Sequence, residues 1–219
     1  QAGFTRSWDL TAGAYGASWT QLTNFVTAAN VGQIEFNVIA LDTETGEMVD
    51  NWETPGATVL AAMYDGTRVI ASSPDQLYEI VLATGEVRPQ VDGANAVSIT
   101  PSWKHNVVFV TDTRGYINLV YLPGQHSAYE MDLGGPPIQA IDNRAGTRLF
   151  VLLETSPDVQ VIDTEQFLVT DRIPLDGIDP TTARIAPSPD GTLLYVLDRS
   201  ESRLVAIDLG TKQVVAEVR

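Results

Sequence analysis

Aromatic residues recur at one spacing along the 219-residue chain. Trp19, Tyr64 and Trp103 each stand six residues before the centre of a short apolar segment. Three aromatic side chains on one face could stack on sugars or bind the side chains of a protein partner. Aromatic residues at such positions can equally cover the ends of structural units, so both interpretations stay open.

Acidic and arginine residues lie in a second set of polar turns, which includes the segments TDTRGY (111–116) and DRSES (198–202). Carboxylates gathered at one rim could hold a hard cation such as Ca²⁺, although the same residue types are common in ordinary turns. We predict no cofactor. Calcium is the one metal that the pattern allows, and its ligand residues are unknown. The predicted ligand-binding residues are Trp19, Tyr64, Trp103, Asp112, Arg114, Asp198 and Arg199.

The sequence offers little for catalysis. His105 and His126 are the two histidines, and both fall in expected turns. The chain has no cysteine, which excludes thiolate nucleophiles, thiolate metal sites and disulfides. A Gly-x-Ser-x-Gly nucleophile signature is also absent from the sequence. We therefore predict no catalytic residue.

The elements that would position these residues are repeated. Five apolar segments are centred on Phe25, Ile70, Phe109, Phe150 and Tyr195, with spacings of 45, 39, 41 and 45 residues. A second set of segments aligns at Asp42, Val81, Val120, Asp163 and Asp208, with spacings of 39, 39, 43 and 45 residues. Asp-Gly pairs at positions 65–66 and 190–191 supply the positive backbone angles that tight hairpins need. Two independent markers thus keep one period near 40 residues.

A period of this length, made of short β-branched strands and polar turns, predicts an all-β fold, a β-propeller with about five four-stranded blades. The expected blades span residues 12–53, 57–91, 95–133, 137–175 and 181–219, and residues 1–11 would form an extra outer strand. That additional strand leaves two alternatives open. The chain forms a closed five-bladed ring, or it forms an arc of a larger ring whose exposed sheet faces invite self-association.

The segment SPDGTLLYVLDRSESRLVAIDLGTKQVVAEV (188–218) resembles the propeller repeat named for Tyr-Val-Thr-Asn, with Tyr195-Val196 in place of its Tyr-Val. This repeat occurs in surface-layer and lactonase-like proteins. The segment NVIALDTETGEMVDNW (37–52) is similar to repeats of quinoprotein-dehydrogenase-type propellers. These motifs mark turns and core positions, so the resemblance implies the fold and carries no catalytic residue onto this chain.

The net charge of −15, with 13 basic and 28 acidic residues, disfavours nucleic acid and anionic membranes as partners. The sequence has no run of about 18 apolar residues, so we predict no insertion into a membrane. Acidity, few lysines and a first residue other than Met suggest an exported prokaryotic protein. We predict a non-catalytic binding or assembly module with a protein or glycan partner. The alternative is an oxidoreductase or lactonase-like hydrolase subunit with a metal or quinone-type cofactor at the central channel.

Overall fold

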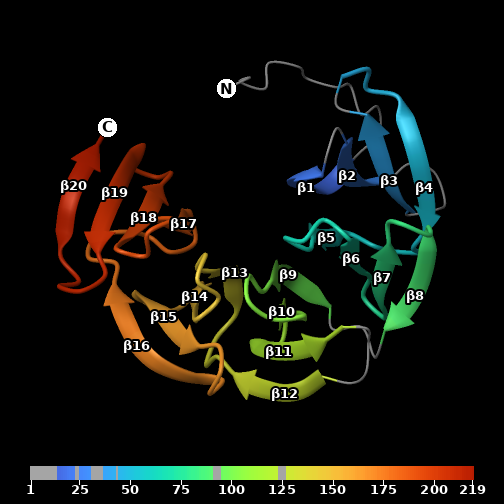
Figure 1. Ribbon diagram of the computed structural model, residues 1–219. Coiled ribbons are helices and arrows are strands. Elements are labelled where there is room, and N and C mark those ends of the chain that lie inside the picture. Colours follow the sequence, from blue (N-terminus) through green and yellow to red (C-terminus); the bar gives the residue numbers. More distant parts are fainter. Residues whose placement is uncertain (1–13, 23–24, 31–36, 43, 91–94, 123–126) are drawn as a thin grey trace.

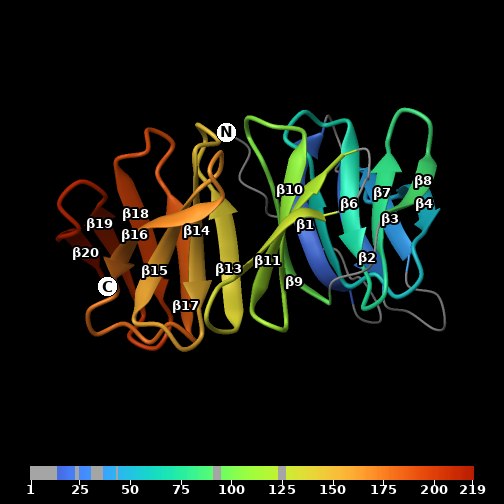
Figure 2. The ribbon, with the colours of Figure 1, turned by 90° about the horizontal axis from the view of Figure 1, so that it is seen from below.

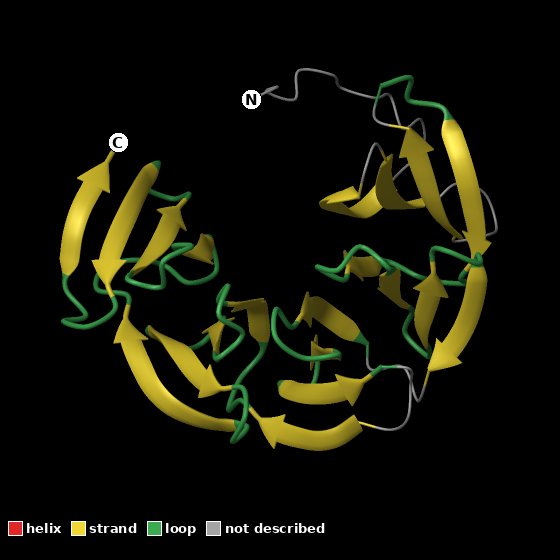
Figure 3. Cartoon of the chain, in the orientation of Figure 1, coloured by secondary structure: helices red, strands yellow, loops and turns green. Residues whose placement is uncertain are grey.

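The computed structural model describes residues 14–22, 25–30, 37–42, 44–90, 95–122 and 127–219. Within these ranges the chain consists of strands, turns and loops, without helix (Figure 3). The described part therefore contains no helix that is long and apolar enough to cross a membrane.

The strands form five antiparallel four-stranded sheets, each built from consecutive strands. Blade 1 contains β1 (Ala14–Leu22), β2 (Phe25–Asn30), β3 (Asn37–Asp42) and β4 (Met48–Glu53). Blade 2 contains β5 (Val59–Ala62), β6 (Arg68–Ser72), β7 (Leu77–Val81) and β8 (Glu86–Gln90). Blade 3 contains β9 (Ala96–Pro101), β10 (Val107–Asp112), β11 (Tyr116–Tyr121) and β12 (Ser127–Asp132). Blade 4 contains β13 (Pro137–Asp142), β14 (Arg148–Leu153), β15 (Asp158–Asp163) and β16 (Leu168–Pro174). Blade 5 contains β17 (Ala183–Pro187), β18 (Leu193–Asp198), β19 (Arg203–Asp208) and β20 (Val214–Val218).

The turn residues of the sequence set the strand boundaries. Gly66 and Gly191 have φ angles of 72° and 73° in the hairpins that lead into β6 and β18. Glycine enters this left-handed region without steric cost, which is why Asp-Gly marks these turns. The second turn motif depends on an aspartate at the end of the third strand. Asp208 Oδ1, for example, accepts hydrogen bonds from the backbone nitrogens of Gly210 and Thr211 at 3.0 and 2.7 Å.

The five blades follow one another around an open arc (Figure 1). The first strand of each blade lies toward the middle of the arc and the fourth strand lies at its outer rim. Seen from the side, the strands run between two faces of a flat molecule (Figure 2). Blades 1 and 5 stand at the two ends of the arc, on either side of an opening (Figure 1).

The hydrophobic core lies between blades. Because side chains alternate along a strand, each sheet has two apolar faces, and each face packs on a different neighbour. In β14, Leu149 and Val151 pack against blade 3, whereas Phe150 and Leu152 pack against blade 5. Comparable clusters join blades 1 and 2 and blades 2 and 3. Consecutive residues of one strand thus belong to two separate cores.

Polar side chains also join neighbouring blades. The Gln139 side chain in blade 4 donates to the Ile185 carbonyl and accepts from the Ile185 nitrogen, both at 2.9 Å. Thr100 Oγ1 in blade 3 donates to the Ala140 carbonyl at 2.8 Å. Such bonds satisfy backbone groups of inner strands that have no further strand beside them, and they fix the height of one blade relative to the next.

The predicted all-β propeller of four-stranded blades is confirmed, and every described strand lies within one of the expected blade ranges. The extra outer strand expected over residues 1–11 lies outside the described residues.

The interblade cores predict a position-specific loss of stability. Leu152→Ala empties a fully buried site between blades 4 and 5 and is expected to lower the free energy of unfolding by about 2–5 kcal/mol. Leu168→Ala removes the same atoms from a residue that is 42% exposed on β16 and is expected to cost less than about 1 kcal/mol. Urea unfolding followed by circular dichroism measures both. Equal losses in the two variants would contradict this account of the core.

Candidate functional site

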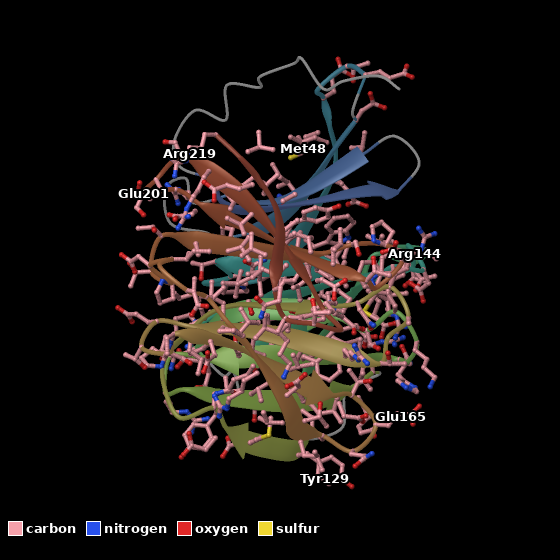
Figure 4. The ribbon with its side chains drawn as sticks, turned by 90° about the vertical axis from the view of Figure 1, so that its left-hand side faces the viewer. Met48, Tyr129, Arg144, Glu165, Glu201 and Arg219 are labelled. Atoms are coloured by element: carbon pink, nitrogen blue, oxygen red, sulfur yellow. The ribbon has the colours of Figure 1, made fainter. Side chains whose placement is uncertain are left out.

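The candidate site lies on the face of the molecule formed by the first-to-second and third-to-fourth turns of the blades, here called the hairpin face. Strands alternate in direction, so these turns lie opposite the second-to-third turns. Figure 4 shows Arg144 and Glu165, from two hairpin-face turns of blade 4, on one side of the molecule and Glu201, from a second-to-third turn, on the other. The turns after β5, β9 and β13 place Tyr64, Trp103 and Arg144 on the hairpin face.

These three side chains form a row across blades 2, 3 and 4. The rings of Tyr64 and Trp103 are stacked, with centroids 3.5 Å apart and planes 7° from parallel. The Arg144 guanidinium carbon lies over the Trp103 ring, 5.9 Å from its centroid. Tyr64 and Arg144 come from blades 2 and 4, which flank the blade that carries Trp103. The row nevertheless stays at the surface, since Tyr64 is 37% and Trp103 is 43% exposed.

Basic residues of blades 2 and 3 lie beside the row. Arg68, Lys104 and His105 line a surface depression together with Tyr64 and Trp103. Lys104 forms an ion pair with Glu165 in the next blade, and Arg68 Nη1 lies 3.2 Å from Oε1 of the buried Glu79. Lys104 and Arg68 are therefore held in place by acidic partners.

A buried carboxyl supports the row from below. Asp142, 2% exposed, ends β13, and its Oδ2 accepts a hydrogen bond from the Trp103 backbone nitrogen at 3.0 Å. Among the described residues its Oδ1 has no hydrogen-bond partner. Burial raises the pKa of Asp142 to about 6, against the lowering effect of bonds from Trp103, Ser102 and Asn143. Burial, and then the charge of Asp142, raises the pKa of Tyr64 to about 12.

This arrangement is suited to recognition. It presents the edges of two fixed aromatic rings and one guanidinium, with the ionisable Asp142 enclosed beneath them. In the part of the chain that the structure describes, no three His, Asp or Glu side chains gather in a way that could hold a metal ion.

Of the aromatic residues predicted to bind, the structure brings Tyr64 and Trp103 together, and the part of Trp19 in the site stays a prediction. Trp19 lies within β1, three residues before the strand ends at Leu22, and its side chain is outside the description. Its position relative to the strands differs from that of Tyr64, because Phe25 begins β2, whereas Ile70 is the third residue of β6. Arg144 has the correct spacing, six residues before Phe150, and was missed because only aromatic residues were sought at that position.

The other predicted site residues lie on the opposite face, in separate blades. Asp112 and Arg114 are paired in the β10–β11 turn, with Oδ2 and Nη2 2.6 Å apart, and Asp112 is fully buried. The buried Asp198, at the end of β18, instead bonds Arg203 Nε at 2.9 Å. Burial opposes its ionisation, but bonds from Ser200 and Arg203 keep the pKa of Asp198 below its usual range.

Both aspartates therefore brace their own turns, and Arg199 is exposed beside Asp198. Ligand binding at Asp112, Arg114, Asp198 and Arg199 stays a prediction. Of the two histidines, His105 lies in the hairpin-face depression, and His126 lies outside the described residues.

No family model matches the sequence, and no curated protein matches it. Among solved structures, the chain is similar to one chain of the crystal structure of the mitotic checkpoint complex, with a TM-score of 0.75 and 14% sequence identity. The match covers 94% of this chain and 65% of that chain, so this chain spans about two thirds of that length. The likeness supports the propeller fold, and the Tyr-Val-Thr-Asn repeat type stays a prediction.

The raised pKa of Asp142 predicts a pH-dependent gain from Asp142→Asn. A folded pKa of about 6 against an ordinary value of 3.8 means that the folded state holds the proton more tightly. The resulting stability is fully present below about pH 4 and is lost as the pH rises through about 6. As the pH rises from 4 to 7, the wild type loses this stability and the variant does not. The free energy of unfolding of the variant, minus that of the wild type, is therefore expected to rise by at most about 3 kcal/mol. Thermal unfolding of both proteins across this range measures the difference, and a constant difference would contradict the prediction.

The close approach of two hairpins predicts that Gly146→Ala is destabilising. Gly146 has a φ of 65°, and a Cβ on it would lie 2.7 Å from the Lys104 backbone nitrogen and closer still to the Lys104 Cβ. The hairpins of blades 3 and 4 would have to separate, at an expected cost of more than about 1 kcal/mol. Gly191→Ala is the control, because its φ of 73° is similar and no atom lies within 4 Å of its added Cβ. Equal thermal shifts in the two variants would rule out the close approach as the cause.

Proposed function

We propose that the chain is an exported, non-catalytic module that binds a protein partner through the hairpin face. The carrying observation is the exposed row of Tyr64, Trp103 and Arg144 across three blades. Tryptophan, tyrosine and arginine are the residue types that dominate binding energy at protein interfaces. A propeller supplies the rigid support that such a surface needs.

The geometry favours a protein partner over a glycan. Sugars bind aromatic residues by lying flat against an open ring face. Tyr64 covers one face of the Trp103 ring, and the Arg144 guanidinium carbon lies 5.9 Å from the ring centroid. The surface therefore offers ring edges and hydrogen-bond donors, which suit the side chains and backbone carbonyls of another protein.

The row is also ordered before a partner arrives. Each side chain is held by a group from a neighbouring blade, and Asp142 fixes the backbone of Trp103. Ordering a free side chain at an interface costs about 0.5–1.5 kcal/mol, and much of that cost is already met in this arrangement. The basic residues beside the row add donors for an acceptor-rich partner surface.

Two further points support the proposal. The similar solved chain is part of a protein complex, which is a property of that protein and a precedent for this fold. The proposed export rests on the acidic composition and on the low number of lysines, which are Lys104 and Lys212.

Site-specific photo-cross-linking tests the partner surface. A photoreactive residue at Ala145, which is exposed next to Arg144, is expected to give discrete protein adducts in extracts of the native host. The same group at Arg199, on the opposite face, is the matched control and is expected to give few. Trp103→Ala should reduce the Ala145 adducts at least about 10-fold, as the loss of a central aromatic contact at an interface does.

Three results would contradict the proposal. Adducts formed mainly from position 199 would place the partner on the opposite face. Ala145 adducts that Trp103→Ala leaves unchanged would remove the aromatic row from the interface. A stoichiometric metal or a visible chromophore in the purified protein, found by elemental analysis and absorption spectroscopy, would contradict the non-catalytic role.

A further inference from the structure

A cleft of about 250 Å³ lies between blades 4 and 5, here called the interblade cleft. The apolar part of its lining belongs to the core between these blades and consists of Phe150, Val161, Ile173 and Leu209. The polar part consists of Arg148, Thr170 and Asp171, which are all accessible to solvent. The cleft therefore joins an apolar floor to a charged rim.

Aromatic rings fill the equivalent place between blades 3 and 4. Strand pairing makes Tyr129 of β12 equivalent to Asp171 of β16. Phe167 and Lys212 are also equivalent, since each has a positive φ, 52° and 61°, four residues after the aspartate that ends the third strand. The rings of Tyr129 and Phe167 meet across blades 3 and 4, with centroids 6.2 Å apart. Across blades 4 and 5, Asp171 and Lys212 instead form an ion pair.

A third position changes in the same way. Val107 stands two residues before Phe109, packs in the core between blades 3 and 4 and is 3% exposed. Arg148 stands two residues before Phe150, on the same side of its strand, and is exposed. Three apolar or aromatic positions of one interface are thus charged in the next, while the phenylalanine of the floor is kept. The cleft lies where the missing side chains would pack.

The charged groups of the rim differ in their pairing. The hydrogen bond from Lys212 lowers the pKa of Asp171, so this pair stays ionised near neutral pH. The Arg148 guanidinium, in contrast, has no ion pair and no hydrogen bond to any part of the chain that the structure describes. Asp163 lies opposite Arg148 in the strand pairing, but its Oδ1 accepts from two backbone nitrogens of its own turn at 2.9 and 2.7 Å.

We propose that the interblade cleft binds a small aromatic carboxylate, with its carboxylate on Arg148 and its ring on the floor around Phe150. The planar guanidinium matches a carboxylate through two parallel hydrogen bonds. A ring suits the floor because rings occupy the equivalent place between blades 3 and 4. The volume corresponds to roughly eight water molecules, which limits the ligand to about the size of benzoate.

Long-range charge does not prevent this binding. The net charge of −15 repels an anion at a distance, but at about 0.15 M salt this repulsion is screened beyond about 8 Å. The contact with Arg148 is direct and keeps its strength. Arg148 and Lys212 both disfavour a cationic ligand, and Asp171 is already paired with Lys212.

Titration of the purified wild-type chain with benzoate, followed by methyl NMR spectroscopy, tests the site. Benzoate is expected to shift the methyl signals of Val161, Ile173 and Leu209, with a Kd of about 1 mM or tighter. Benzylamine carries the same ring with a positive charge, and benzyl alcohol carries it without charge. Both are expected to bind at least about 10-fold more weakly than benzoate.

Two variants test the roles of the rim. Arg148→Met should weaken benzoate binding at least about 10-fold, and Arg148→Lys should recover part of the loss. Arg172→Met is the matched control, because Arg172 is an exposed arginine beside Asp171 but lies on the other side of β16. Asp171→Tyr combined with Lys212→Phe rebuilds the aromatic pair of the preceding interface and should abolish binding by filling the cleft.

The proposal is overturned if benzoate at about 10 mM, ten times the expected Kd, leaves these methyl signals unchanged. It is also overturned if benzyl alcohol or benzylamine binds as tightly as benzoate, if Arg172→Met and Arg148→Met have equal effects, or if the double variant still binds. The comparison of the three ligands uses the wild-type chain alone, so it decides the matter even where a variant folds poorly.

Discussion

A four-stranded blade has two apolar faces and no interior of its own, and the whole molecule follows from that constraint. Neighbouring residues of one strand serve different cores, as Leu149 and Phe150 do on either side of blade 4. A slip of one residue in strand register would exchange the two faces, so the pairing is tightly specified. Polar bonds between blades, such as those of Gln139, then set the height of the next blade. Stability therefore accumulates blade by blade along the arc.

The surface features arise from the same packing. Blades that meet face to face bring their turns together at the edge, which is how Tyr64 reaches Trp103 from another sheet. At that edge, a Cβ on Gly146 would clash with Lys104, so the two hairpins can approach this closely only with glycine at position 146. The hairpin face is thus rigid for structural reasons, and a partner that binds there meets a prepared surface.

Period and turn chemistry were sufficient to predict the fold, because both are local and repeat five times. The site was predicted only in part. Tyr64 and Trp103 followed from spacing, whereas Arg144 acts through its guanidinium and escaped a search for aromatic residues. Trp19 has the same spacing but lies within β1, where the pairing with β2 is irregular between Ser18 and Leu22, so spacing alone does not fix its place. The role of Asp142 depends on burial between blades, and the open arc depends on the angle between blades, neither of which is encoded in a spacing.

The acidity of the chain is better explained by its turns than by a ligand. The pKa values of Asp42 and Asp208 are lowered first by hydrogen bonds from the backbone nitrogens of Thr45 and Thr211. Their contribution to stability is present above the usual carboxyl pKa and is lost as the pH falls through the lowered value. Asp142, whose pKa burial raises, has the opposite dependence. Aspartates in the exposed turns thus stabilise the fold near neutral pH. Asp142, buried beneath the hairpin face, instead costs stability at that pH, and it orients Trp103.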